Sequence, residues 1–256
     1  MLDCMRSTIE DLNGTPPKDE SIWRNYRHPD IRHPIQSFLF RALHGSLHIG
    51  DFWRNIPNYD HHAFCPHCRD ETENLDHILL KFPHRQANTI WELTKSAWLR
   101  SLGQWPGIHL GTILGCGSLM LPSHRDDCRP NRGKSRLLHI IISESAHLIW
   151  ALCCENVIQG TVHMKESTTR RWLHKVNQLL MLDKYISKRW NKKPVTRDLV
   201  NEIWLPLLLQ QTPHLEQDWI SNNEVLVGIT LTEPPFQWEG QPTHGAPHTP
   251  HDTGSA

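Results

Sequence analysis

The sequence predicts a mainly α-helical protein that carries a small zinc knuckle and ends in a disordered Pro/His-rich tail. Three observations lead to this prediction. Over several long segments, apolar residues recur at spacings of three and four, the period of an amphipathic helix. Strand signals are nearly absent, since only residues 224–231 are a candidate strand. Residues 232–256 mix Pro with Gly, His and Thr, a composition that buries too little apolar surface to fold.

The N-terminal region is expected to begin with a flexible lead-in over residues 1–20, because the turn-forming run from Asn13 to Pro17 limits regular structure past residue 12. A short helix over about residues 21–28 follows. The next predicted helix runs from Pro34 to Leu43, and Gly45 stands where a left-handed residue ends a helix.

An amphipathic helix is predicted after Pro83, with Gly103 behind it and an irregular segment up to residue 130. Its apolar stripe consists of Ile90, Trp91, Thr94, Ala97, Trp98 and Leu102. These positions share one face at the helical period. We therefore expect this helix to pack against a core.

Three helices are predicted in the C-terminal half. The first covers about residues 137–158 and is closed by Gly160, and the second covers about 167–190 and ends before Pro194. Thr196 is a plausible N-cap for a last helix through Leu207, whose final turn is left open because Pro206 lies within it.

Charge and cysteine usage restrict the class of protein. Lys+Arg and Asp+Glu balance at 27 each, so any surface for nucleic acid must be local. The N-terminus lacks the apolar run of a signal peptide. The sequence also contains no stretch of 18 apolar residues, which argues against a membrane span. Seven cysteines without framework spacing fit an intracellular protein of the nucleus or cytoplasm, where paired cysteines more often bind metal than form disulfides.

The cysteine pair Cys65 and Cys68, followed by His77, is the main candidate site. Two thiolates separated by two residues can grip one ion, because the intervening turn brings both sulfurs to one side. Zinc prefers such soft ligands and needs two more donors to complete a tetrahedron. His77 provides one of them.

The region around this cluster resembles the reverse-transcriptase zinc-binding domain found near the C-terminus of non-LTR retrotransposon polyproteins. The resemblance covers Ser21 to about Leu99, and the segments that carry it are Ile22-Trp23, Phe38 to Leu47, Cys65 to Cys68, Glu73 to Leu80 and Ile90-Trp91. Three later segments resemble the C-terminal region of such elements in fungi: Gly115 to Gly117, Ser143 to Trp150 and Val225 to Ile229.

The resemblance implies a reverse-transcriptase zinc-binding-like domain over residues 21–103 and a helical C-terminal region over 104–231. It also implies zinc as cofactor and Cys65, Cys68 and His77 as ligands. The family pattern places a fourth cysteine where this chain has Phe82. His84 is the provisional substitute, and His61, His62 and His67 are near in sequence.

By the same resemblance the chain is a nucleic-acid-binding module that assists a retroelement polymerase and is not itself an enzyme. The carboxylates that bind Mg²⁺ in polymerases and nucleases belong to segments upstream in the polyprotein. RNA or DNA is the expected partner, and we do not expect binding to a membrane.

A basic segment gives independent support for nucleic-acid binding. Residues 165–193 contain nine Lys or Arg and two acids. The predicted phosphate-binding residues are Arg170, Arg171, Lys175, Lys184, Lys188, Arg189, Lys192 and Lys193. A solvated helix face explains the same charges equally well, and Trp172 is better explained as core than as a base-stacking platform.

Two other classes of function remain open. Cys-Pro-His-Cys also occurs in thiol-disulfide oxidoreductases, but these place the pair at a helix N-terminus after a strand, and Asn58 to Phe64 does not have the pattern of a buried strand. Alternatively, the chain is a structural remnant of a truncated retroelement with a degenerate metal site, in agreement with Phe82 at a ligand position.

Overall fold

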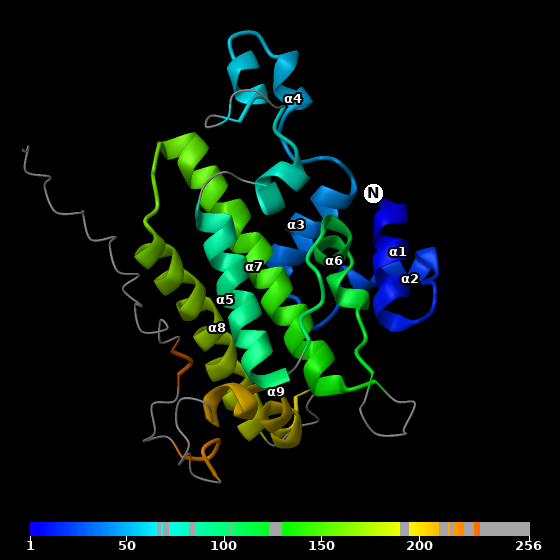
Figure 1. Cartoon of the computed structure of the whole chain (residues 1–256), viewed down its shortest axis with the longest axis vertical. Coiled ribbons are helices and arrows are strands. Elements are labelled where there is room, and N and C mark those ends of the chain that lie inside the picture. Colours follow the sequence, from blue (N-terminus) through cyan, green and yellow to red (C-terminus); the bar gives the residue numbers. More distant parts are fainter. Residues whose placement is uncertain are drawn as a thin grey trace, which may run out of the picture.

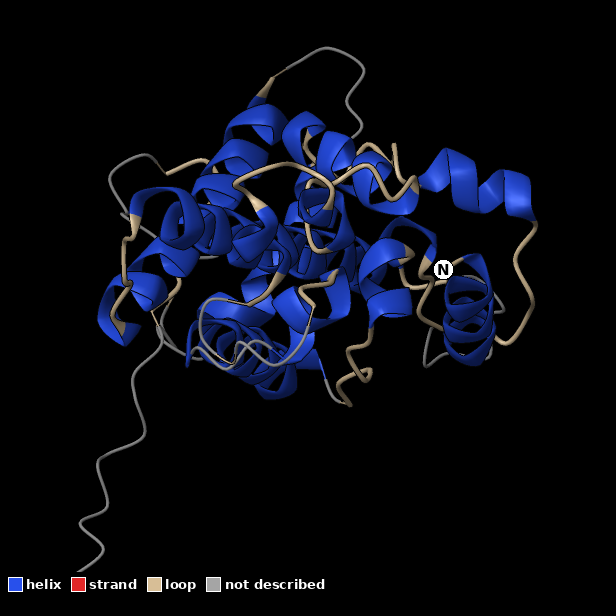
Figure 2. Ribbon diagram, turned by 90° about the horizontal axis from the view of Figure 1, so that it is seen from above, coloured by secondary structure: helices blue, strands red, loops and turns tan. Residues whose placement is uncertain are grey.

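The computed structural model describes residues 1–65, 68, 72–81, 85–102, 104–122, 130–189, 195–209, 215, 218–222 and 228–230. Over this part of the chain the protein is mainly helical, as predicted, and only two isolated bridges pair extended residues. Figure 2 shows the helices clustered around a common centre.

The described helices follow in chain order. They are α1 (Leu2–Asn13), α2 (Asp19–Asn25), α3 (His33–Leu43), α4 (Asp51–Arg54), the 3-10 turn η1 (Asp60–Ala63), the π-helical turn η2 (His77–Lys81), α5 (Arg85–Leu102), α6 (Leu110–Leu114), the 3-10 turn η3 (Cys116–Ser118), α7 (Arg132–Gln159), α8 (Lys165–Lys188) and α9 (Arg197–Leu209) (Figure 1).

The long helix α7 lies at the centre of the molecule and contacts α3, α5, α6, α8 and α9 (Figure 1). Its apolar side chains point in nearly every direction, as expected of a helix that is covered on all sides. Buried residues run from Gly133 to Asn156, so the core extends along most of the helix.

This burial also explains the composition of α7. Its most apolar window has a mean hydropathy of 1.6, and by length and composition alone the helix could cross a membrane. However, 78% of that window is buried inside the protein. Its contacts with five other helices account for its apolar character without a bilayer.

A chain of hydrogen bonds ties the three longest helices together in the core. The Ser145 hydroxyl of α7 lies 2.8 Å from the Thr94 hydroxyl of α5 and accepts the indole N–H of Trp172 of α8 at 2.9 Å. All three side chains are buried. Trp172 is therefore a core residue, as predicted.

Most of the predicted helices are confirmed, with ends within a few residues. Gly45 follows α3 with a φ of 60°, and the amides of Gly45 and Ser46 bond back to the carbonyls of Ala42 and Arg41, which is a Schellman ending. Gly160, with a φ of 65°, ends α7. Thr196 accepts the amide of Leu199 as a cap should.

Two expectations about helix extent are corrected. Residues 1–20 are not simply a lead-in, because residues 2–13 form α1, whose Met5 and Ile9 are almost fully buried. These side chains contribute to the common core, and α1 packs against α6. The segment predicted to be irregular up to residue 130 contains α6 and η3. The final turn of α9, which the sequence alone leaves open, continues through Pro206 to Leu209. The candidate strand 224–231 lies largely, and the tail 232–256 entirely, outside the described residues.

The buried hydrogen-bond chain gives a test of the core. Ser145→Ala leaves the Trp172 indole N–H buried without its acceptor, so we expect it to lower the free energy of unfolding by about 1–3 kcal/mol. Ser7→Ala, which removes the hydroxyl of an exposed serine from α1, is the matched control. Urea denaturation measures both variants, and equal stabilities would contradict the role given to Ser145.

Candidate metal centre

The candidate site lies where an extended lobe joins the helical body. This lobe, residues 46–65, carries α4 and η1 and lies beyond the ends of α5 and α7 (Figure 1). Its end is held by an isolated bridge between Phe64 and Thr72 and by the Glu73 amide, which donates to the Ala63 carbonyl at 2.9 Å. These contacts close the loop that contains both cysteines.

Gly50 shows how closely the two segments approach. A Cβ atom built at this position would lie 2.2 Å from the Glu73 carbonyl oxygen, and its φ of 52° is a conformation that side chains disfavour. Glycine is therefore required there for two reasons. The start of α4 is thereby fixed against the strand-like segment that leads to His77.

His77 is presented by an unusual helical turn. The Asn74 side chain accepts the His77 amide at 2.8 Å and so starts the turn, and residues 77–81 then adopt the wider π-helical form of η2. Such π turns are frequent at functional sites. The turn packs against α5 and α7, which leaves His77 only 4% exposed.

The three predicted ligands Cys65, Cys68 and His77 come together. One ligand atom from each lies within 4.8 Å of the others, and the Cys68 Sγ is 3.7 Å from the His77 Nε2. In a tetrahedral zinc site, bond lengths of about 2.3 Å to sulfur and 2.05 Å to nitrogen put these two atoms about 3.6 Å apart. The spacing therefore fits a shared metal ion.

The other ligand candidates have different positions. His84 and Phe82 lie outside the described residues, as does His67. His61 is exposed and His62 half-buried on the lobe, and neither belongs to the group of converging donors.

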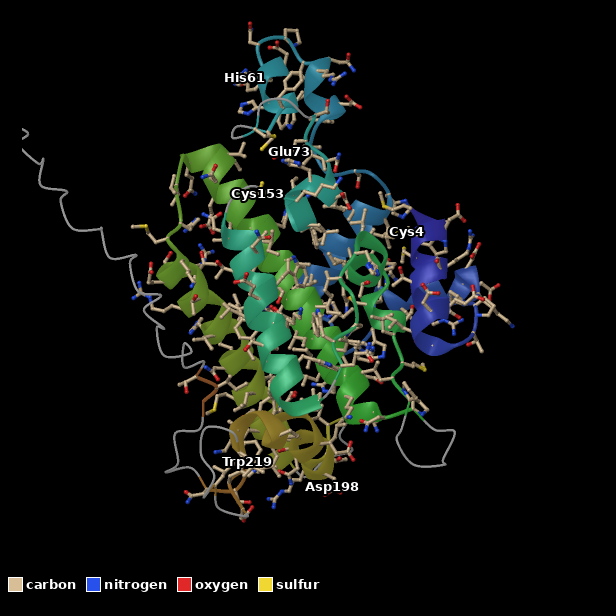
Figure 3. The ribbon with its side chains drawn as sticks, in the orientation of Figure 1. Cys4, His61, Glu73, Cys153, Asp198 and Trp219 are labelled. Carbon is tan, nitrogen blue, oxygen red and sulfur yellow. The ribbon has the colours of Figure 1, made fainter. Side chains whose placement is uncertain are left out.

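Beneath the cluster lie three residues that the spacing of the cysteines does not indicate: Glu73, Cys153 and Cys154. Figure 3 shows Glu73 and Cys153 close together under the lobe, and the Cys153 thiol is 4.0 Å from the Glu73 Oε1. Burial raises the pKa of Glu73 from 4.5 to about 7. Burial also raises the pKa of Cys154 to about 11, with a smaller contribution from Glu73. No sequence signal identifies this group, because α7 brings Cys153 in from 80 residues away.

The predicted phosphate-binding residues of α8 are only partly free to bind nucleic acid. Arg171 pairs with Glu155 through two bonds of 2.6 Å. Lys184 is buried and donates to the Asn222 carbonyl at 2.8 Å, and burial lowers its pKa.

The remaining predicted cations of α8 vary in exposure. Lys188 donates to the Ser221 carbonyl at 3.3 Å, and Lys175 is half-buried. Arg170 and Arg189 are exposed. Lys192 and Lys193 lie outside the described residues.

The oxidoreductase alternative requires a strand before the cysteine pair and a helix starting at it. Among the described residues, Cys65 follows the 3-10 turn η1 and a single bridge, and no helix begins there. Its thiol is also fully buried. This arrangement suits a ligand better than an attacking nucleophile.

Comparison with protein-family models, with curated proteins and with solved structures finds no match to this chain. The resemblance to the reverse-transcriptase zinc-binding domain therefore stays a prediction, and the function rests on the chemistry of the site.

The raised pKa of Glu73 predicts a pH dependence in metal-free protein. Below pH 4.5 the carboxyl group is protonated in both states. Between pH 4.5 and about 7 the unfolded chain loses this proton first, so stability falls as pH rises. At about 1.4 kcal/mol per pKa unit, the full loss is about 3 kcal/mol.

Glu73→Gln should remove this loss, making the variant more stable than the parent at pH 8 and no more stable at pH 4.5. Urea denaturation with a chelator present measures the difference. Glu92→Gln, on the exposed side of α5, is the control. Parallel pH profiles of the parent and Glu73→Gln would contradict the prediction.

Proposed function

We propose that this protein is a zinc-stabilised nucleic-acid-binding module of the kind that accompanies a retroelement reverse transcriptase, without a catalytic site of its own. The observation that carries the proposal is the convergence of Cys65, Cys68 and His77 at the base of the lobe. The resemblance of residues 21–103 to the zinc-binding domain agrees with it.

Zinc is the metal that this donor set favours. Two thiolates and an imidazole are soft or borderline ligands, which select zinc over Mg²⁺ or Ca²⁺. Cys65 is fully buried and Cys68 half-buried, so water has limited access to the sulfurs. In this position zinc would join the lobe to η2 and to the helices beneath, which is a structural role.

The lobe itself has the surface expected of a single-strand binder. We call His48, Phe52, Trp53, Tyr59, His61 and His62 the aromatic surface. Phe52 is 43% exposed and Tyr59 50% exposed. The rings contact one another, as in His48 stacked on Phe52 with centroids 4.0 Å apart. Exposed aromatic rings provide platforms on which unpaired bases stack.

Charge on the lobe is modest, so stacking rather than phosphate contact is the expected source of affinity. Arg54 is exposed but pairs with Asp51 at 3.0 Å and lies over the Phe64 ring. Arg170 of α8 and Arg189, the residue that follows α8, are exposed and are candidates for additional phosphate contacts, although Arg189 donates to the Tyr185 hydroxyl at 2.6 Å. We therefore expect a shallow dependence of affinity on salt.

Zinc and nucleic-acid binding should be linked. The lobe is joined to the body through the segments that contain the ligands, and the Phe64–Thr72 bridge lies between them. Holding Cys65, Cys68 and His77 on one ion restricts how this connection can move. Removal of zinc should therefore weaken nucleic-acid binding even though zinc does not touch the nucleic acid.

The zinc site is tested by metal content. Protein purified without added zinc should contain about one zinc per chain at the knuckle, and Cys65→Ser should remove it because a hydroxyl is a poor zinc ligand. Cys4→Ser changes an exposed cysteine on α1 and should leave the zinc content unchanged. Zinc that is absent from the parent, or unaffected by Cys65→Ser, would exclude the site.

The aromatic surface is tested by affinity for a single-stranded oligonucleotide, measured by fluorescence anisotropy. Each stacked base contributes about 1–3 kcal/mol, so Phe52→Ala and Tyr59→Ala should each weaken binding by about 5- to 150-fold. Phe40→Ala removes a ring that is 41% exposed on α3, outside the lobe, and is the matched control.

The outcomes of this test separate the alternatives. Loss of affinity in the lobe variants alone supports the aromatic surface. Loss only in Arg170→Glu and Arg189→Glu, with a steep salt dependence, would assign binding to α8 instead. No measurable binding together with no zinc would support a structural remnant.

A further inference from the structure

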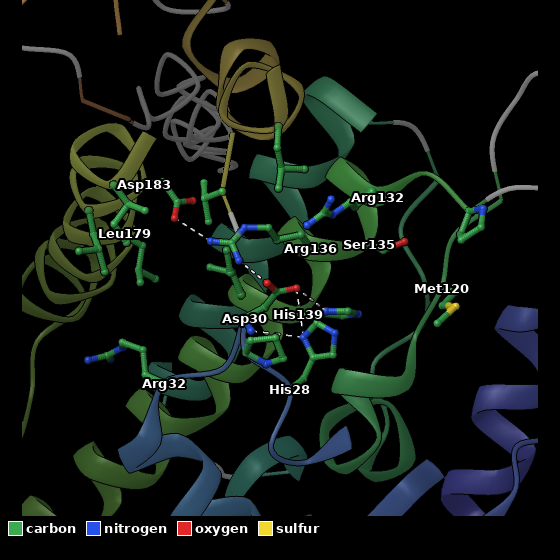
Figure 4. Close-up of a pocket in the computed structure, with 17 residues that line it drawn as sticks. His28, Asp30, Arg32, Met120, Arg132, Ser135, Arg136, His139, Leu179 and Asp183 are labelled. Carbon is green, nitrogen blue, oxygen red and sulfur yellow. Dashed lines mark hydrogen bonds and ion pairs between the residues drawn. The ribbon is translucent and has the colours of Figure 1, made fainter. Parts of the chain in front are cut away.

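A second group of possible metal ligands lies far from the knuckle, at the opposite end of α7. It consists of His28 and Asp30, in the connection between α2 and α3, and His139 on α7. One ligand atom from each lies within 4.8 Å of the others. Figure 4 shows these side chains meeting beside a cavity of about 570 Å³.

The contacts of His139 show which of its two ring nitrogens carries a proton. Its Nε2 lies 2.7 Å from the Leu119 carbonyl oxygen, which can only accept, so Nε2 carries a proton. The other ring nitrogen, Nδ1, faces the Asp30 Oδ2 at 3.1 Å. If the ring of His139 is neutral, its Nδ1 therefore directs a lone pair at the Asp30 Oδ2, which also carries lone pairs. Because two lone pairs repel each other, either a second proton or a cation must lie between these two atoms.

His28 makes the cation the better explanation. Its Nδ1 accepts the Asp30 amide at 3.3 Å and also lies 3.2 Å from the same Oδ2. Two ring nitrogens thus face one carboxylate oxygen, and a nitrogen that accepts the amide has a lone pair and no proton to donate to that oxygen. One ion between them would bind the carboxylate oxygen and the lone pairs of both ring nitrogens, and it would replace the long 3.3 Å amide contact of the His28 Nδ1.

The spacing of the donor atoms suits such an ion. With bonds of about 2.1 Å, adjacent ligand atoms lie about 3.0 Å apart at right angles and about 3.4 Å apart in a tetrahedron. The observed separations of 3.1 and 3.2 Å fall between these values. A metal-binding histidine usually donates its other ring N–H to a carbonyl or carboxylate, which orients the ring. The bond from the His139 Nε2 to the Leu119 carbonyl is of this kind.

The other carboxylate oxygen of Asp30, Oδ1, is bound by Arg136 on the side away from the histidines. Arg136 donates to Oδ1 and, at 2.6 Å, to Asp183, which is buried and also accepts the Trp204 indole N–H at 3.0 Å. The positive charge of Arg136 is therefore balanced by Asp183, and Oδ2 stays directed at the two histidines. The side chains of His28, Asp30 and His139 all line the cavity, so an ion there can be reached from solvent.

We propose that His28, Asp30 and His139 form a second metal site, which binds a divalent first-row transition ion through two imidazoles and one carboxylate. The donor set favours Zn²⁺, Co²⁺ or a similar ion over Mg²⁺ and Ca²⁺. Positions left by the three protein ligands face the cavity, where the ion holds water or a small oxygen-donor ligand. This site shares no residue with the knuckle.

The test is a Co²⁺ titration of the full chain followed by absorption spectroscopy. The knuckle binds cobalt through sulfur and produces a thiolate-to-cobalt charge-transfer band, whereas the second site has no sulfur ligand. The parent should bind about two equivalents of Co²⁺. Cys65→Ser should lose the charge-transfer band and keep a d–d spectrum from the second site.

Adding His28→Gln to Cys65→Ser should abolish this remaining spectrum. The His28 side chain is 29% exposed, so its replacement is expected to be tolerated, and circular dichroism checks the fold. His33→Gln, an exposed histidine on α3, is the matched control and should change nothing. In a folded Cys65→Ser protein, failure to bind Co²⁺, or binding unaffected by His28→Gln, would overturn the proposal.

Discussion

The burial of α7 is the constraint on which the rest of the structure depends. A helix that is apolar on nearly all faces must be covered, and α3, α5, α6, α8 and α9 cover it. Its few polar side chains then need partners inside the protein. Ser145 finds Thr94 and Trp172, and Glu144 pairs with Arg32 at the start of α3. These pairings fix how the surrounding helices sit around α7.

Both candidate metal centres follow from this arrangement. Cys153, near one end of α7, lies under the knuckle, and His139 belongs to the second group of donors. Fourteen residues of helix separate them, which places the two positions about 20 Å apart. An ion at the knuckle would join the lobe to η2, whereas an ion at the second group would lie between a loop and α7. The two sites are therefore independent in ligands and in the segments that they hold.

Hydrophobic periodicity was enough to predict most of the helices, because α3, α5, α8 and α9 pack through apolar stripes that are visible in the sequence. In α7 the apolar residues lie on nearly every face, and a long run of them indicates the helix. The helix α1 has such a stripe as well, formed by Leu2, Met5, Ile9 and Leu12 at spacings of three and four. The prediction missed it because the turn-forming run from Asn13 to Pro17 favoured a flexible segment over residues 1–20. For the knuckle, Cys65, Cys68 and His77 are close enough in sequence for their spacing to indicate a shared ion.

Contacts between residues far apart in the sequence could not be predicted from periodicity or from the spacing of ligands. His28 and His139 are more than a hundred residues apart, and only the packing of α7 brings them together. Charge counts on α8 could not show that Lys184 donates to the Asn222 carbonyl, because that carbonyl comes from a later segment. Net charge describes a segment, whereas binding depends on which side chains have no partner in the folded protein.

We infer that Cys65, Cys68 and His77 hold one zinc ion. The most direct measurement is an anomalous-difference map at the zinc absorption edge, from crystals of the full chain grown without added metal. We expect a peak between the two Sγ atoms and the His77 Nε2, at about 2.3 Å from each sulfur. A map with no peak at that position would contradict it.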